Sequence, residues 1–363
     1  MRATFRWRTG WSFTPDPCHE RRILNILSPL RNAAEVAPLR EAGADEFYCG
    51  LAPPEWTNTF GAAWSSRRNP DSAGVSSEQA LKDILAAAGP VPVYAALNAP
   101  HYPPGAVEML TEFGDHLLRH TGIGALIVAD MDLLLALIGA GHAAQLHLSS
   151  LVTSTNAASS RFFKALGVGR IILPRHLTLD EIEHCVVEGV EFEAFVINDG
   201  CVFEEGLCAT THAAGTFCLA DGDGLQDMPA ATLDRYAFFK WTQNNCGCGS
   251  SRGFPLGPCG LCAIPKLQAA GVRSLKVVGR EASPQRKYAS VKLTAMARDI
   301  ARNGGGPQSI KQATIAMRGA ASLCHGADGC YYPDLWEGHK AVHQPLRDDT
   351  RLAIRIASTG APS

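Results

Sequence analysis

Short apolar runs alternate with longer amphipathic segments between residues 23 and 302. The apolar runs are rich in Val, Ile, Leu and Ala, as buried parallel strands are, whereas the longer segments repeat apolar residues at helical spacing. This alternation is typical of a parallel α/β fold. The predicted strands are residues 23–27, 46–49, 91–97, 125–129, 145–148, 170–173, 193–197 and 274–278, and the predicted helices are residues 33–42, 77–88, 105–120, 133–138, 157–166, 179–188 and 284–302.

Seven or eight strand and helix units of this kind predict a TIM-like (β/α) barrel. The alternation stops after the strand at 193–197, where a long segment rich in cysteine and glycine follows. In such barrels the loops at the carboxyl ends of the strands build the active site, so we expect this segment to cover the barrel mouth. The expected organisation is an N-terminal extension (1–22), a barrel (23–302) with a Cys-rich insertion (199–266), and a linker and C-terminal tail (303–363) that starts with a glycine-rich break.

The cysteines limit the possible kinds of functional site more than any other residue type does. Seven of the twelve cysteines lie close together in short-spaced groups, with glycines between them that allow tight turns. Thiolates bind soft metals, and several must converge on one point to do so, so the grouping predicts a metal or iron-sulfur centre. The seven are Cys201, Cys208, Cys218, Cys246, Cys248, Cys259 and Cys262.

Spacing alone leaves two kinds of centre open. The pairs Cys246-x-Cys248 and Cys259-x2-Cys262 stand at a distance typical of a tetrahedral zinc ribbon, which makes zinc as well supported as iron-sulfur. Both centres can coexist, because Cys201, Cys208, Cys218, Cys324 and Cys330 would remain for a second one.

Charge and hydropathy exclude several classes of protein. The formal net charge is −2, so no overall positive field gathers nucleic acid, and a small aromatic or lipid-like substrate is favoured, while a local basic patch would keep RNA open as a substrate. The most apolar window, residues 125–140, contains Asp130 and Asp132 and is too short to cross about 30 Å of hydrocarbon. The start of the chain shows no secretory signal pattern, so we expect reduced cysteines, a cytoplasmic location and no membrane association.

Several motifs resemble peptidase family U32. Glu193-Ala194-Phe195, followed by a segment from Gly200 to Cys208, is similar to the family pattern Glu-x-Phe and then Cys-x4-Gly-x-Cys. Other segments match in the same order, and the resemblance covers about residues 23–302. These segments are Leu27-Ser28-Pro29, Ala42-Gly43-Ala44-Asp45, Tyr48, Asn156, Arg175, Leu261-Cys262, Ala270-Gly271-Val272, Ser274-Leu275-Lys276 and Gly279-Arg280.

The resemblance implies a barrel that carries a 4Fe-4S cluster and acts in oxygen-independent hydroxylation. The family's targets include the ubiquinone ring, a ribosomal RNA cytidine and a tRNA wobble uridine, with prephenate as the implied hydroxyl source. By position, the implied cluster ligands are Cys201, Cys208 and Cys262, with Cys246 as the fourth and Cys248 or Cys218 as alternatives.

The chain also departs from the family pattern. Asn198 follows Ile197 where the family has His-Gly, His176 follows Arg175 where it has Arg-Glu, and Val278 replaces a glutamate. These changes keep open a non-catalytic accessory subunit, bound to a cluster or zinc, that works with a homologous U32-family partner. A peptidase is a third reading, but the sequence shows no nucleophile elbow or zinc-peptidase motif.

Polar residues near the predicted strand ends supply the candidate mouth groups. Arg175 and Arg280 can together clamp a dicarboxylate or phosphate, although either arginine could instead pair with a nearby carboxylate. His176 suits proton transfer but can equally be structural. Asp130 is expected to cap the next helix, and the Arg67-Arg68 pair to lie in a solvated loop. The candidate catalytic residues are Arg175, His176, Asp199, Lys276 and Arg280, with Asn98 and Asn198 as further mouth groups.

Overall fold

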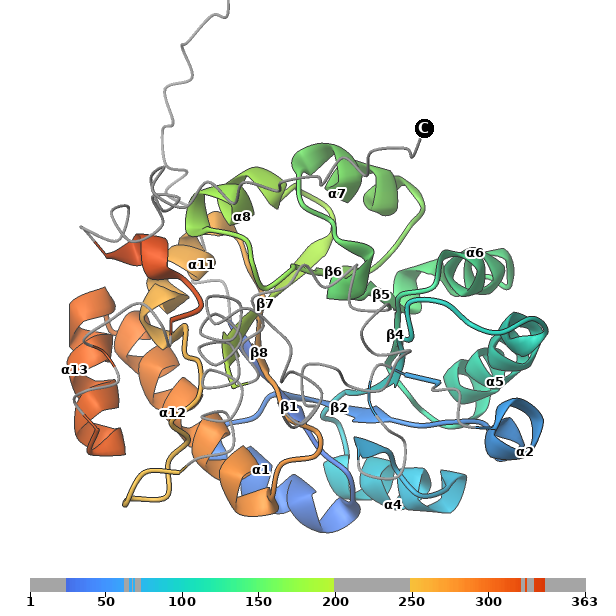
Figure 1. The fold of residues 1–363 in the computed structure, drawn as a ribbon, viewed down its shortest axis with the longest axis horizontal. Coiled ribbons are helices and arrows are strands. Elements are labelled where there is room, and N and C mark those ends of the chain that lie inside the picture. Colours follow the sequence, from blue (N-terminus) through green and yellow to red (C-terminus); the bar gives the residue numbers. More distant parts are fainter. Residues whose placement is uncertain are drawn as a thin grey trace, which may run out of the picture.

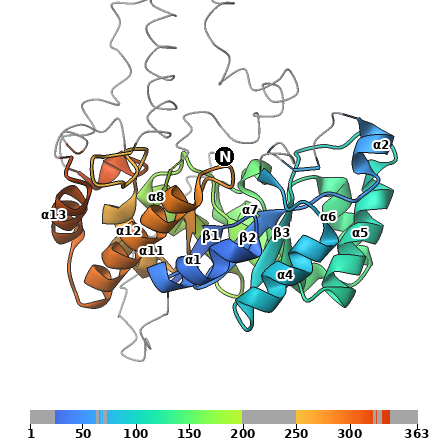
Figure 2. The ribbon, with the colours of Figure 1, turned by 90° about the horizontal axis from the view of Figure 1, so that it is seen from below.

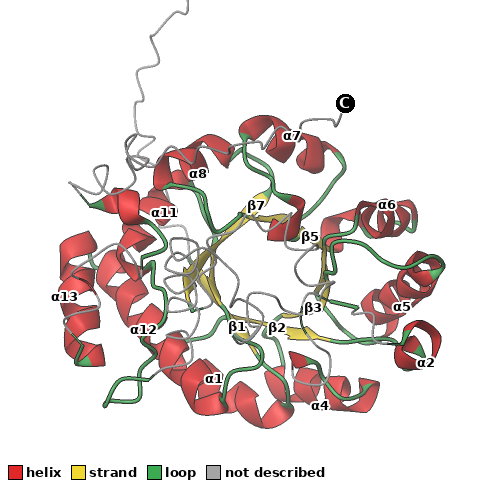
Figure 3. Cartoon of the chain, viewed as in Figure 1, coloured by secondary structure: helices red, strands yellow, loops and turns green. Residues whose placement is uncertain are grey.

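Eight parallel strands close into a barrel in the order in which they occur in the chain, which confirms the predicted TIM-like fold. The computed structural model describes residues 24–61, 65–66, 68, 73–198, 249–320, 324 and 330–336. Figure 1 looks down the barrel, and Figure 3 shows the strands as an inner ring inside the helices. The strands are β1 (Asn25–Pro29), β2 (Glu46–Gly50), β3 (Val93–Leu97), β4 (Ala125–Val128), β5 (Leu146–Leu148), β6 (Arg170–Ile172), β7 (Glu191–Ile197) and β8 (Ser274–Val277).

Helices cover the outside of the barrel (Figure 2). Most follow a strand and return the chain to the start of the next strand, as the sequence pattern predicts. They are α1 (Val36–Ala42), α2 (Trp56–Phe60), α4 (Glu78–Ala88), α5 (Ala106–His120), α6 (Met131–Gly139), α7 (Ala157–Ala165), α8 (Leu179–Cys185), α11 (Ile264–Ala270), α12 (Pro284–Arg302) and α13 (Pro307–Arg318). Short 3-10 helices are η1 (Ala33–Glu35), η2 (Ala143–Gln145), η3 (Ser150–Val152), η7 (Leu261–Ala263) and η9 (Pro333–Leu335).

Local sequence explains where several helices begin. The side chain of Ser77 accepts a hydrogen bond from the Ala80 N–H, 3.1 Å away, at the start of α4. Asp130 does the same for Leu133 N–H at 2.9 Å and begins α6, which confirms its predicted capping role. Such caps satisfy N–H groups that have no partner within the helix.

The barrel closes where β8 pairs with β1. Asn25 lies opposite Ser274, and Leu27 lies opposite Lys276. Since side chains alternate between the two faces of a strand, the interior receives every second residue, and Lys276 is one of the interior residues. The register between β7 and β8 shifts between Phe195 and Ile197, close to the barrel mouth.

The C-terminal region differs from the sequence prediction. Residues 303–306 were expected to begin a linker, but Pro307 starts the twelve-residue helix α13, which packs against α12 and η7. Proline suits the first turn of a helix because the missing N–H would have no helical partner there. The glycine-rich turn therefore joins two packed helices. No helix in the described parts of the chain has the length and apolar character needed to cross a membrane.

Candidate functional site

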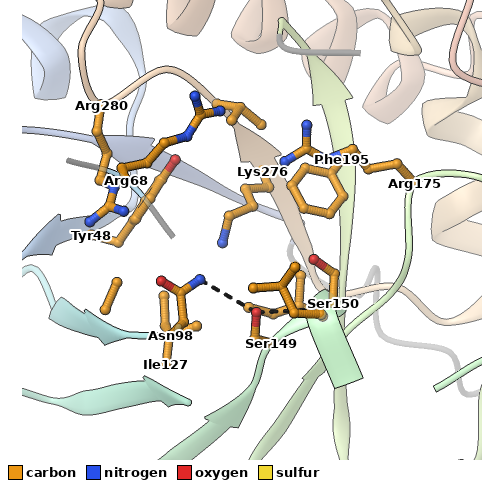
Figure 4. A pocket seen from close by; sticks show the side chains of 14 residues that line it. Tyr48, Arg68, Asn98, Ile127, Ser149, Ser150, Arg175, Phe195, Lys276 and Arg280 are labelled. Atoms are coloured by element: carbon orange, nitrogen blue, oxygen red, sulfur yellow. Dashed lines mark hydrogen bonds between the residues drawn. The ribbon is translucent and has the colours of Figure 1, made fainter. Parts of the chain in front are cut away.

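A polar cavity opens at the carboxyl end of the barrel strands (Figure 4). It encloses about 510 Å³, including space that is continuous with solvent. Its polar lining is positively charged, whereas its apolar lining comes from strand residues below the mouth. The lining residues are Tyr48, Arg68, Ala96, Asn98, Ile127, Ser149, Ser150, Leu151, Ile172, Arg175, Phe195, Lys276, Val278 and Arg280.

Three predicted catalytic cations meet in this cavity. Arg175 follows β6, Lys276 lies within β8, and Arg280 follows β8, and all three are at most 7% exposed. The guanidinium of Arg175 lies over the Phe195 ring, 4.3 Å from its centroid. Cations held in a partly dry cavity attract anions more strongly than they would in water. The structure thus brings together three side chains that are far apart in the sequence.

Lys276 is held by a buried carboxylate. Its Nζ lies 2.5 Å from Glu193 Oε1 and 4.4 Å from the centroid of the Tyr48 ring. Burial lowers the pKa of Lys276, and the nearby charges of Arg170 and Arg175 add to this, while Glu193 opposes it. Glu193 belongs to the Glu-x-Phe motif but was not predicted as a site residue. A carboxylate on the inward face of an otherwise apolar strand was the signal that could have revealed it.

Arg280 combines burial with incomplete hydrogen bonding. Its Nη2 donates to Ser66 Oγ at 3.2 Å, whereas Nη1 is buried and has no hydrogen-bond partner within the described structure. A Cβ at Gly50 would lie 2.1 Å from Nη1, so glycine in β2 provides the space for this guanidinium. Buried donors normally have partners, and a donor without one at a cavity wall indicates a place for an acceptor from a ligand.

Arg68 lies in a loop, as expected, but it is half-buried and also lines the cavity, and its Nη1 is 3.3 Å from Glu281 Oε1. Arg67 lies outside the described residues. Arg68 and Arg280 lie on the same side of the cavity in Figure 4. The opposite side carries hydroxyl and amide groups, where Asn98 Nδ2 donates to Ser149 Oγ at 3.4 Å. Asn98 was predicted as a mouth group, whereas the two serines at 149 and 150 were missed because serine alone gives no chemical signal.

Other predicted residues lie elsewhere. His176 is exposed and is not part of the cavity lining, so its catalytic role stays a prediction without support from its position. Asn198 is buried and donates to Val278 O and Ser290 Oγ, and its φ of 66° places it in the left-handed region, so it shapes the end of β7. Asp199 lies outside the described residues.

Below the mouth, the barrel interior contains a charge network that the sequence analysis missed. Arg170 Nη1 donates to Glu46 at 2.7 Å and to Glu193 at 3.1 Å, and Arg170 Nη2 lies 2.9 Å from Glu191. Burial would raise the pKa of Glu46, but hydrogen bonds from Arg170, Asn25 and Ser274 and the charge of Arg170 outweigh it and lower the pKa. Because Glu193 binds both Arg170 and Lys276, it connects this network to the cavity.

His147 lies in the same interior. Its ring meets Tyr94 edge to face, with 4.5 Å between the centroids, and it is 7% exposed. Burial, followed by the charges of Arg170 and Lys276, lowers the pKa of His147 well below its usual value, which favours the neutral imidazole. A histidine between the two leucines of β5 was the sequence signal for this residue.

The cysteines divide into two groups. Cys201, Cys208, Cys218, Cys246 and Cys248 lie outside the described residues, so their predicted ligand roles stay predictions. Cys259, Cys262, Cys324 and Cys330 are free thiols that approach one another near the end of β7. Across the described ranges, no three His, Cys, Asp or Glu side chains already stand at metal-binding distance.

The barrel and its cavity define a TIM-like α/β protein with a positively charged mouth. A family model described as "Peptidase family U32" matches residues 31–326. The chain belongs to peptidase family U32, which confirms the resemblance found in the sequence.

The chain is also similar to a curated protein of known activity. The chain is 28% identical over 200 residues to the 23S rRNA 5-hydroxycytidine C2501 synthase of Escherichia coli (strain K12). The match covers 52% of this chain but only 27% of that protein, so the chain spans about a quarter of the relative's length.

Solved structures align with the chain at low TM-scores. The U32 peptidase Mk0906 aligns with a TM-score of 0.38 and 14% identity, over 62% of this chain and 90% of that one. The tryptophan synthase alpha chain from Legionella pneumophila subsp. pneumophila aligns with a TM-score of 0.35 and 11% identity, over 84% of this chain and 93% of that one. Likeness at this level carries no argument about fold, substrate or reaction.

Proposed function

We propose that this chain is an oxygen-independent hydroxylation enzyme whose barrel mouth binds the carboxylates of the hydroxyl donor. The observation that carries the proposal is the convergence of Arg175, Lys276 and Arg280 on one cavity. Family membership and the hydroxycytidine synthase relative support the class of reaction. A dicarboxylate such as prephenate fits a cavity with several cations, because guanidinium groups bind carboxylates through parallel hydrogen bonds.

Each cation has a distinct part in binding. Arg280 has a buried N–H group for which the described residues provide no acceptor. The guanidinium of Arg175 lies over the Phe195 ring, on the other side of the cavity. Lys276 lies between them in Figure 4. Its ammonium group donates a hydrogen bond to the buried Glu193 carboxylate, which fixes its position. Since burial lowers the pKa of Lys276, this residue can also release or accept a proton at a lower pH than an ordinary lysine. The apolar strand residues below exclude water from the bound donor.

Replacing a C–H bond with a C–OH bond, when the hydroxyl oxygen is at the oxidation level of water, releases one proton and two electrons. The reaction therefore needs a hydroxyl donor and an external two-electron acceptor to which a cluster would pass the electrons one at a time. A 4Fe-4S cluster bound by Cys201, Cys208, Cys246 and Cys262 would supply single-electron transfer. The chemistry of the available donors suits it, since the Cys262 thiol lies half-buried in η7 at the carboxyl end of the barrel. The other three cysteines lie outside the described residues, in the stretch of sequence between β7 and η7.

Anaerobic purification followed by substrate analysis tests the proposal. An Escherichia coli strain that lacks its own hydroxycytidine synthase would express either this chain or the Arg175→Met variant. Mass spectrometry would then search RNA nucleosides and small aromatic metabolites for products that gain one oxygen atom. We expect such a product only with the unmodified chain. Identical product profiles in both strains, with equal protein levels, would contradict the proposal.

The accessory-subunit hypothesis makes a different prediction in the same experiment. This alternative rests on the altered residues at Asn198 and Val278, and the hydrogen bonds that Asn198 donates to Val278 O and Ser290 Oγ support a structural part for it. An accessory subunit would give the product only when a homologous partner is expressed with it. Peptidase activity has less support, because the described cavity lining contains two adjacent serines but no histidine or carboxylate that could activate them.

A further inference from the structure

Lys276 brings a primary amine to the wall of the cationic cavity. Its side chain leaves β8 on the interior face of the barrel and extends toward the centre of the cavity in Figure 4. The residue is only 6% exposed, so a bound ligand would meet its Nζ largely without water. An amine in this position can do more than attract a carboxylate, because a neutral lysine is also a nucleophile toward carbonyl carbon.

The surroundings of Lys276 favour loss of its proton. Burial is the largest cause of its lowered pKa, Glu193 opposes this effect, and the positive charges of Arg170 and Arg175 add to it. A lysine that is removed from water and lies near other cations is typical of enzymes that form imines with carbonyl substrates. This amine therefore becomes neutral more readily than a surface lysine does.

Glu193 lies where a proton from this amine can be received. Its Oε1 accepts a hydrogen bond from Lys276 Nζ at 2.5 Å, and its Oε2 accepts one from Arg170 Nη1 at 3.1 Å. Since Arg170 holds the second oxygen, the first one stays directed at the amine. A fully buried carboxylate within hydrogen-bond distance of a nucleophile has the geometry of a general base.

The rest of the cavity suits a ligand with a carboxylate next to a ketone. Arg175 and Arg280 lie on either side of Lys276 in Figure 4, and Arg280 Nη1 is a buried donor without a partner among the described residues. Another wall carries the amide of Asn98 and the hydroxyl of Ser149, which suit hydrogen bonds to a ketone oxygen. These groups together fit a 2-oxo acid, whose carboxylate binds an arginine while its ketone carbon faces the amine.

We propose that Lys276 forms an imine with the ketone carbon of a 2-oxo acid bound in the cavity. Glu193 accepts one proton from the ammonium group, and the neutral Nζ then bonds to the ketone carbon while a second nitrogen proton passes to the ketone oxygen. Glu193 returns its proton to the resulting hydroxyl group, which leaves as water as the carbon–nitrogen double bond forms. One ammonium ion and one ketone thus give one iminium ion and one water, with no change in oxidation state.

The charges of the site are the same before and after this reaction. The iminium nitrogen carries the single positive charge that the ammonium group had, so the ion pair with Glu193 is kept. The ring of Tyr48, whose centroid lies 4.4 Å from Lys276 Nζ, likewise continues to face a cation. Imine formation therefore does not leave the buried carboxylate unpaired, which would be costly.

This covalent site goes beyond the proposed function and rests on it only for the binding of a ligand carboxylate in the cavity. An imine would hold the ligand in one orientation, and its positive charge would withdraw electrons from the neighbouring carbon atoms. Prephenate carries a 2-oxo acid group, so the imine and the proposed hydroxyl donor are chemically compatible.

Borohydride trapping tests for the imine directly. The anaerobically purified full-length chain would be incubated with pyruvate, a small 2-oxo acid, and then treated with sodium borohydride, which reduces an imine to a stable secondary amine. We expect the intact mass to show one reduced pyruvate group per chain. Trypsin cleaves an unmodified chain after Lys276, so the modified residue should appear in an uncleaved peptide from Ser274 to Arg280.

Two matched arginine variants provide the controls. Lys276→Arg should abolish the adduct, because a guanidinium group keeps the positive charge opposite Glu193 but stays protonated. Lys266→Arg, at an exposed position in α11, should leave the adduct unchanged. Glu193→Gln should slow adduct formation by about 100-fold, as expected for loss of a general base. An unchanged rate in this variant would remove Glu193 from the proton transfer.

The wild-type chain also gives a readout that does not depend on whether a variant folds. In urea the lysines of the unfolded chain become similar in environment, so the preference for Lys276 should disappear. Absence of the adduct from the folded chain, or labelling of Lys276 no greater than that of exposed lysines, would overturn the proposal. An adduct without any oxygenated product would contradict only the proposed function, whereas an oxygenated product without the adduct would contradict only the imine.

Discussion

The two ends of the barrel interior differ in how far their buried arginines are paired with carboxylates and other acceptors. Toward the strand starts, Arg170 is surrounded by Glu46, Glu191 and Glu193, which neutralise it and use its donors. At the mouth, Arg280 keeps a buried N–H without a described acceptor beside other cations. The comparison teaches that a compensated network holds the barrel together, whereas the mouth keeps one buried Arg280 donor available for an acceptor from a ligand. Substitutions at the two ends should therefore separate stability from binding.

The largest effect is expected from Arg170→Met. The substitution leaves Glu46 and Glu193 buried without their main partner, and breaking a buried charge pair on one side costs about 3–5 kcal/mol. Urea denaturation followed by circular dichroism would measure the free energy of unfolding. Arg40→Met, at an exposed position in α1, is the control and should change it by less than about 0.5 kcal/mol. A loss as small as the control's would show that the network is not structural.

Arg280→Met should have the opposite effect, with stability nearly unchanged and ligand binding weakened. The variant removes a buried cation with an unsatisfied donor, so the free energy of unfolding should stay within about 1 kcal/mol or rise. Prephenate binding should weaken by about 10–100-fold, the value of a charge-assisted hydrogen bond. Isothermal titration calorimetry would measure the affinity, with the exposed Arg302→Met as the control. Unchanged affinity would remove Arg280 from the binding site.

Gly50→Ala tests the same contact through packing. The new methyl group would displace the Arg280 guanidinium from its position, since it would lie 2.1 Å from Nη1. We expect prephenate affinity to fall by about tenfold, with a stability loss of about 1–3 kcal/mol from overpacking. Gly139→Ala in α6 is the matched control, because nothing lies within 4 Å of its added Cβ. An affinity equal to the control's would mean that the arginine can move without consequence.

The smallest effect is expected for the way in which the free energy of unfolding depends on pH. Glu46 has a lowered pKa in the folded chain, so it contributes stability above its ordinary value of 4.5 and loses this contribution as pH falls through the lower folded value. Glu46→Gln should therefore be less stable than the wild type by about 1 kcal/mol near neutral pH. The difference should shrink as the pH falls below 4.5, measured by urea denaturation across the range. A difference that does not vary with pH would contradict the link to this carboxylate.

Much of the barrel could be predicted from sequence. Apolar runs and helical periodicity located all eight strands and most helices, and the caps at Ser77 and Asp130 set helix starts by local hydrogen bonds. Helix α13 was missed, because a glycine-rich break looks the same whether it begins a linker or turns between packed helices. Family motifs likewise identified Arg175, Lys276 and Arg280, which do meet in the cavity.

Tertiary structure decided which of these charges are compensated. Glu46, Arg170 and Glu193 are far apart in the chain, and only the closure of β8 onto β1 makes the eight strands share one interior. The same closure gave Arg68 a place in the cavity and left His176 on the surface. The chain alone determined the strands, the helices and the residue types available for chemistry, because these depend on local patterns. Which side chains become partners depends on long-range packing, and that is why it could be read only from the folded barrel.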